Sequence, residues 1–247
     1  MCIHEITTEK ASGRRSRPRD ATDANAANGN RVKGLIFDMD GLMFDSERLA
    51  RDAYRVVASR RGFDLPGSLV DSTMGFLCSE VKEKLQAYFD AEGIDADASD
   101  VYRERNDLVL AMVEEGGVPE KPGLRELIAY AQNMDMKLAV ASASSPKRVG
   151  AFLGRSGMAD VFDIVVNGGD VKKGKPDPEI FLLTAKRLGL EPKECLVLED
   201  SENGLHSAVS AGMPAIVVPD RVQPSAEARG LAAAVLPSLS DVIAWLS

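Results

Sequence analysis

The sequence has few cysteines, less positive than negative charge and no long apolar run. No stretch reaches the roughly 18 consecutive apolar residues of a membrane-spanning helix, which excludes an integral helical membrane protein. The three cysteines, Cys2, Cys78 and Cys195, lie far apart without metal-ligand spacing, so we expect free thiols and a cytoplasmic protein. The 30 Lys and Arg residues are outnumbered by 38 Asp and Glu residues, and the net charge of −8 argues against nucleic-acid or membrane-surface partners.

The first 31 residues differ in composition from the rest of the 247-residue chain. They are polar and slightly basic, whereas the remainder is strongly acidic. They lack the apolar core of a secretory signal, and their acidic residues argue against an organellar transit peptide. We expect residues 1–31 to form a flexible, dispensable extension rather than a targeting signal or a nucleic-acid-binding arm.

Beyond this segment, short apolar runs typical of β-strands alternate with helical segments. The runs are Val32–Phe37, Lys137–Ala141, Phe162–Val166, Cys195–Leu198 and Ala215–Val218. Between them, residues 122–133 have a helical apolar face, and a further helix is predicted to begin at Asp177 and end at Gly189. This alternation predicts an α/β fold: a Rossmann-like parallel sheet covered by helices.

The interval 45–117 breaks the alternation, because it contains amphipathic helical patterns and no strand-like run. A helical insert directly after the first strand would lie over the end of the sheet. We therefore predict an inserted α-helical cap domain at 45–117 and a core domain built from 32–44 and 118–247.

Two aspartates, Asp38 and Asp40, end the first apolar run, and Gly41 then allows a sharp turn. Ligands of open α/β sheets bind outside the carboxyl ends of the strands. Carboxylates there can hold a divalent cation, and one can act as a nucleophile. An Asp-x-Asp-Gly motif alone is most often a turn, and a calcium loop would need a third acid before its glycine.

The other predicted strands also end in polar residues. Ser142 follows the second, Lys175 lies beyond the third, and Glu199 and Asp200 end the fourth. Since parallel strands bring these ends to one edge, we expect the groups to converge. Carboxylates suit Mg²⁺, and a lysine ammonium suits a phosphoryl group. Residues 169–175 match part of a P-loop, but the following Pro176 cannot supply its hydroxyl, so that match is accidental.

These motifs, in this order, resemble those of the haloacid dehalogenase superfamily, in the helical-cap subgroup that includes β-phosphoglucomutase and many small-molecule phosphatases. The resemblance covers residues 32 to about 220. It rests on Asp38-Met39-Asp40-Gly41, Ser142, Lys175, and Glu199-Asp200 followed by Ser201 to Gly204. It implies that Asp38 is the nucleophile, forming an aspartyl-phosphate, and that Asp40 is the general acid and base.

The same resemblance implies the ligands of the metal and of the phosphoryl group. Mg²⁺ would be held by Asp38, the backbone carbonyl of Asp40 and Asp200, with Glu199 reaching it directly or through water. Ser142, the Ala143 N–H and Lys175 would bind the phosphoryl oxygens, and Asn203 would orient Lys175 or Asp200.

The likeness leaves the exact reaction open. Asp40 disfavours dehalogenation, because the family's dehalogenases lack this second aspartate. Similar mutases carry a histidine where this chain has Ala50, and a cap arginine near the position of Cys78. We therefore expect hydrolysis of sugar phosphates or nucleoside monophosphates by a monomer. A phosphohexomutase and a catalytically idle binding module are the alternatives. The candidate cap cations for contact with a substrate are Arg48, Arg51, Lys82, Arg103 and Arg105.

Overall fold

A computed structural model describes residues 32–73 and 76–247, so the predicted N-terminal extension lies outside the described residues. The predicted α/β fold is confirmed: six parallel strands form one sheet in the order β3-β2-β1-β4-β5-β6. The strands are β1 Gly34–Phe37, β2 Lys137–Ala141, β3 Ile164–Val166, β4 Cys195–Glu199, β5 Ala215–Val217 and β6 Ala234–Val235.

Each of the five predicted runs coincides with a strand: β2 matches at both ends, and each of the others differs at one end by one or two residues. β1 and β3 begin two residues later than predicted, where ladder pairing with β2 starts, and β4 extends one residue further, to Glu199. Strand β6 was not predicted, because two paired residues are too few to show an alternating pattern.

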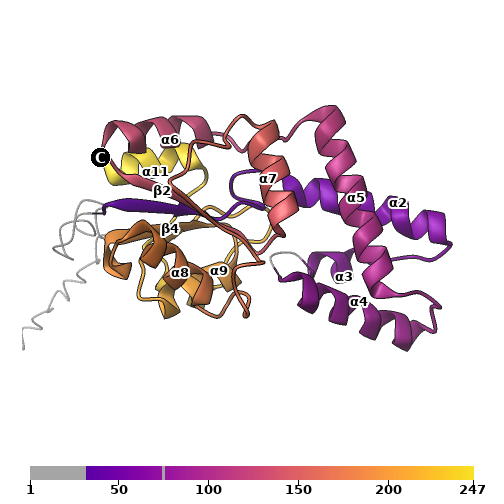
Figure 1. Cartoon of the computed structure of the whole chain (residues 1–247). Helices are drawn as coiled ribbons and strands as arrows, with labels where there is room; N and C mark the ends of the chain where they lie inside the picture. The colour runs from indigo at the N-terminus through magenta and orange to yellow at the C-terminus, as the bar shows by residue number, and fades with distance from the viewer. Residues whose placement is uncertain (1–31, 74–75) are drawn as a thin grey trace, which may run out of the picture.

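Helices cover both faces of the sheet (Figure 1). One face is covered by α6 (Leu124–Asn133), α7 (Pro146–Arg155) and α11 (Leu239–Leu246), the other by α8 (Glu179–Leu188), α9 (Glu202–Ser210) and α10 (Ala226–Leu231). Alternation along β1 sends Leu35 and Phe37 into the first core and Ile36 into the second. The predicted end of α8 at Gly189 is confirmed, with a left-handed φ of 68°. Its start lies two residues after the predicted Asp177, whose side chain accepts the Glu179 N–H.

In the described part of the predicted insert, helices are the only regular elements. It contains α2 (Ser46–Arg61), α3 (Gly67–Asp71), α4 (Cys78–Glu92) and α5 (Ala98–Gly116). Tyr54, Leu85 and Phe89 belong to a third hydrophobic core within this segment. The C-terminal half of α5 packs beside α7 and contributes to the first core. The division into a cap domain and a core domain stays a prediction, which the separate third core supports.

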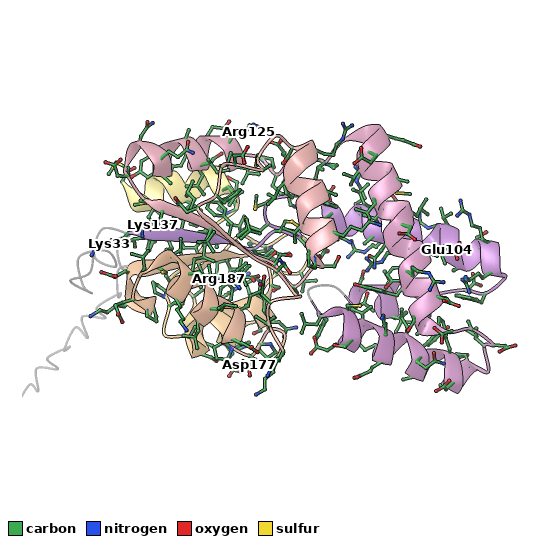
Figure 2. The ribbon with its side chains drawn as sticks, viewed as in Figure 1. Lys33, Glu104, Arg125, Lys137, Asp177 and Arg187 are labelled. Atoms are coloured by element: carbon green, nitrogen blue, oxygen red, sulfur yellow. The ribbon has the colours of Figure 1, made fainter. Side chains whose placement is uncertain are left out.

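The helical segment lies beyond the carboxyl ends of the strands (Figure 1). Figure 2 shows Lys33 and Lys137, before β1 and at the start of β2, at the opposite end of the sheet, whereas Glu104 of α5 lies far beyond the strand ends. Among the described helices, none is both long enough and apolar enough to cross a membrane. Helices α2 to α5 thus lie opposite the edge of the sheet where the sequence predicts the site.

Candidate active site

A cavity of about 570 Å³ lies between the carboxyl ends of the strands and the helical segment. Its wall includes most of the residues predicted from the sequence: Asp38, Asp40, Ala143, Lys175 and Asp200. The remaining two, Ser142 and Glu199, are buried and contact wall residues through hydrogen bonds. The structure thus brings all seven predicted side chains and backbone groups to one place.

Lys175 lies at the centre of this group. Its Nζ is 2.5 Å from Asp38 Oδ1 and 2.5 Å from Glu199 Oε1, and it also donates to the Ala141 carbonyl at 3.3 Å. Burial by itself would lower the pKa of Lys175, but the two carboxylates outweigh it and raise that pKa. The lysine therefore stays charged although it is almost fully buried.

Asp38, Glu199 and Asp200 form an acidic cluster whose ligand oxygens all lie within 4.8 Å of one another. Burial is the main factor that raises the pKa of Asp38 to about 8; repulsion by Glu199 and Asp40 adds to it, and Lys175 opposes it. Burial, with repulsion by Glu199 and Asp38, also raises the pKa of Asp200. One lysine faces three carboxylates, which leaves two negative charges uncompensated when all ionise. Hard oxygen donors with this residual charge fit a divalent cation.

Two glycines let the carboxylates approach the backbone. A Cβ on Gly41, whose φ is 90°, would lie 2.1 Å from Asp200 Oδ2. A Cβ on Gly204 would lie 1.8 Å from Glu199 Cδ. Glu199 also accepts hydrogen bonds from the backbone and hydroxyl of Ser201, which caps α9. Any side chain at either glycine would displace a member of the acidic cluster.

Asp40 has different surroundings. Its carboxylate accepts hydrogen bonds from Ser46, Ser142 and Ser144 and forms an ion pair with Arg148. Burial would raise the pKa of Asp40, but the charge of Arg148 and these hydrogen bonds outweigh it and lower that pKa. The pKa values of the two aspartates of the first motif are therefore shifted in opposite directions.

Sequence reasoning missed Ser46, Ser144 and Arg148. Ser46 begins α2 and Arg148 is in the first turn of α7, so their approach to Asp40 depends on how the chain folds. One signal was present: a basic side chain is unfavourable near the positive end of the helix dipole. Helix stability therefore does not account for an arginine three residues after the Ser145 cap, and this position indicates a role outside the helix.

The predicted phosphoryl-binding groups differ in their present partners: the donors of Lys175 and Ser142 are held by carboxylates. The Ala143 N–H donates to no backbone acceptor in residues 32–73 and 76–247, and Ser142 Oγ accepts the Ser144 N–H at 3.1 Å. The Asp40 carbonyl accepts no backbone hydrogen bond in the same ranges. Asn203 lines the cavity, but within the described chain its side chain makes no hydrogen bond with Lys175 or Asp200.

The helical segment supplies the opposite wall. Of the five candidate cations, Arg51 and Arg105 line the cavity. Lys82 and Arg103 line a separate cavity beside α7, and Arg48 is paired with Asp45 on the surface.

Arg105 is only 4% exposed, and its guanidinium lies 4.5 Å and 5.0 Å from the ring centroids of Tyr54 and Tyr102. Ala50 also lines the cavity, whereas Cys78 does not. A buried cation and an aromatic ring therefore face the acidic cluster across the cavity.

Comparison with known proteins decides the family. A family model described as haloacid dehalogenase-like hydrolase matches residues 32–212. The chain belongs to this family.

Individual members give more detail about this haloacid dehalogenase-like hydrolase. It is 35% identical over 185 residues to the phosphorylated carbohydrates phosphatase of Thermotoga maritima, covering 75% of this chain and 84% of the relative. It is 32% identical over 188 residues to the fructose-1-phosphate phosphatase of Escherichia coli, covering 76% and 97%. The crystal structure of β-phosphoglucomutase from Clostridium difficile is similar with a TM-score of 0.73 and 25% identity, covering 85% and 93%.

Proposed function

We propose that this haloacid dehalogenase-like hydrolase is a magnesium-dependent phosphatase that hydrolyses small phosphate monoesters, foremost sugar phosphates, through an aspartyl-phosphate on Asp38. The observation that carries the proposal is the buried contact of Lys175 with Asp38 and Glu199 beside Asp200. The two phosphatases reported above, one for phosphorylated carbohydrates and one for fructose 1-phosphate, support the substrate class.

The acidic cluster and the Asp40 carbonyl would hold Mg²⁺, in agreement with the hard oxygen donors and the residual negative charge of this site. The bound cation would neutralise part of the phosphoryl charge. Of the two carboxylate oxygens of Asp38, Oδ1 is held by Lys175, which leaves Oδ2 as the candidate attacking atom.

In the first step, an Asp38 oxygen bonds to phosphorus and the bond from phosphorus to the leaving oxygen breaks. Once one of its donors leaves, Asp40 takes up a proton and gives it to that leaving oxygen. In the second step, water attacks phosphorus, the bond to Asp38 breaks, and Asp40 takes the proton of the water. Ser142, the Ala143 N–H and Lys175 hold the phosphoryl oxygens throughout, so the chain's own contribution is mainly positioning and charge compensation.

The structural likeness to β-phosphoglucomutase keeps phosphohexomutase activity as a second candidate. Its specific weakness is Ala50, which lines the cavity where similar mutases have a histidine. No histidine of residues 32–73 and 76–247 lines this cavity. A catalytically idle binding module is disfavoured because the nucleophile, lysine and acidic cluster are all present and in contact.

The proposal is tested by phosphate release from a panel of sugar phosphates and nucleoside monophosphates, with Mg²⁺ and with chelator. We expect release that requires Mg²⁺ and is lost in Asp38→Ala but retained in Asp160→Ala, which changes an exposed carboxylate. Wild-type rates in Asp38→Ala, or release that chelator leaves unchanged, would refute the mechanism. Conversion of β-glucose 1-phosphate to an isomer in the presence of a bisphosphate primer would instead support the mutase.

A further inference from the structure

Arg148 is a buried cation that the proposed mechanism has not used. It lies in the first turn of α7, where the helix dipole disfavours positive charge, and it is only 9% exposed. Burial of a charge is costly unless a partner compensates it. The compensating partner is Asp40, whose Oδ1 lies 2.8 Å from Arg148 Nη2.

The donors around Asp40 are divided between its two oxygens. Oδ1 accepts from Arg148 and from Ser46 Oγ at 2.6 Å. Oδ2 accepts from Ser144 Oγ at 2.7 Å and from Ser142 Oγ at 3.3 Å. A carboxylate offers about four acceptor positions, so all of them are used in this state. Asp40 can exchange a proton with substrate or water only after one donor leaves.

Ser142 is the donor best placed to leave. Its hydrogen bond is the longest of the four, and a serine hydroxyl has a single proton to donate. In the proposed function, Ser142 binds a phosphoryl oxygen, and turning its proton to that oxygen vacates one position on Oδ2. The vacated position lies beside the phosphoryl site, whereas Oδ1 keeps both of its donors.

We propose that Arg148 is a positioning residue that, with Ser46, anchors Oδ1 of Asp40, so that Oδ2 exchanges protons with the leaving group and with water. This inference rests on the proposed function. The guanidinium lies 5.0 Å from the ring centroid of Phe152, one turn along α7, which supports it from behind. Its Nε has no hydrogen-bond partner among the described residues, so the contact with Asp40 is its main polar constraint.

An aryl phosphate separates the two chemical steps. With p-nitrophenyl phosphate, an Asp38 oxygen bonds to phosphorus while the bond from phosphorus to the phenolate oxygen breaks, and p-nitrophenolate departs without a proton. In the second step, water attacks phosphorus, the bond to Asp38 breaks and the proton of the water passes to Asp40 Oδ2. Loss of the anchor should therefore slow the second step and spare the first.

The experiment is rapid mixing of the full-length protein with p-nitrophenyl phosphate and Mg²⁺. For Arg148→Met we expect a burst of about one p-nitrophenolate per protein, with the burst rate near wild type and steady-state turnover at least about tenfold lower. A tenfold loss is smaller than the roughly 10²–10⁴-fold contribution of a general base, because the variant misplaces Asp40 but does not remove it. Arg148→Lys should recover part of the steady-state rate. Arg155→Met, on the same helix and paired with Glu114 at the surface, should match wild type.

Ser46→Ala removes the other Oδ1 donor without burying or exposing a charge, so it tests the same anchor if Arg148→Met does not fold. It should show the same burst followed by slow turnover. Steady-state rates within about twofold of wild type in both variants would overturn the inference. So would an equal fall of burst and steady-state rates, which indicates a structural role. Undiminished turnover in Asp38→Ala would instead refute the proposed function.

Discussion

Magnesium should stabilise this protein more at pH 8 than at pH 6. Because the pKa of Asp38 is raised to about 8, the metal-free carboxyl binds a proton throughout this range more readily than it does in the unfolded chain. The stability gained from that proton is present at low pH and is lost as the pH rises through about 8. A cation bound to the acidic cluster must displace the proton, so the competition is stronger at pH 6.

The size of the effect follows from displacement of one proton. With a pKa of about 8, competition weakens cation binding by a factor of about 100 at pH 6 and about 2 at pH 8. The ratio of about 50 corresponds to about 2 kcal/mol when Mg²⁺ is in excess at both pH values. For a protein of this size, 1 kcal/mol shifts Tm by about 2–4 °C. The Mg²⁺-induced rise in Tm should therefore be about 4–8 °C larger at pH 8.

Differential scanning fluorimetry of chelator-treated protein, with and without Mg²⁺ at both pH values, measures this difference. Asp38→Asn carries no titratable proton at this position, so most of the difference between pH 6 and pH 8 should disappear. An Mg²⁺-induced rise in Tm that is equal at the two pH values, or larger at pH 6, would show that the cation does not compete with the proton on Asp38.

Three further predictions concern single parts of the molecule. Gly204→Ala should lower both turnover, by at least about tenfold, and Tm, because its Cβ overlaps Glu199; Gly150→Ala, with nothing within 4 Å, should do neither. Arg105→Met should raise KM for sugar phosphates by about tenfold with kcat nearly unchanged, since it removes a contact with the substrate that is equally strong in the ground state and the transition state. A fall in kcat alone would contradict this, and Arg103→Met, which changes an exposed arginine, is the control. Deletion of residues 1–30 should leave kcat and KM unchanged, and a large loss of activity would show that the extension contributes to the active protein.

Much of the site could be predicted because its residues follow strands directly. Asp38, Ser142 and Asp200 each come just after a buried apolar run, and parallel pairing brings the carboxyl ends of such runs to one edge. Lys175 lies nine residues beyond β3, and its convergence followed from the family resemblance and the order of the motifs.

The remaining contacts depend on features that local patterns do not specify. Arg148 and Ser46 lie on helices, and their reach to Asp40 depends on the tilt and rotation of α7 and α2. The sequence analysis also grouped Arg105 with Arg103, although of these two only Arg105 lines the cavity. Residues two positions apart on an α-helix point in directions about 200° apart, so the two arginines cannot share one face. Helix rotation is set by packing against the third core and not by helical periodicity alone.

The central claim is that Asp38 forms the covalent intermediate. The most direct test is to mix the protein with Mg²⁺ and the sugar phosphate that it hydrolyses fastest, trap the acyl-phosphate with hydroxylamine, and locate the modified residue by peptide mass spectrometry. The account predicts a hydroxamate at Asp38 that forms only with substrate and is absent when Mg²⁺ is removed. Turnover accompanied by modification of another residue, or turnover without any trapped product, would contradict it.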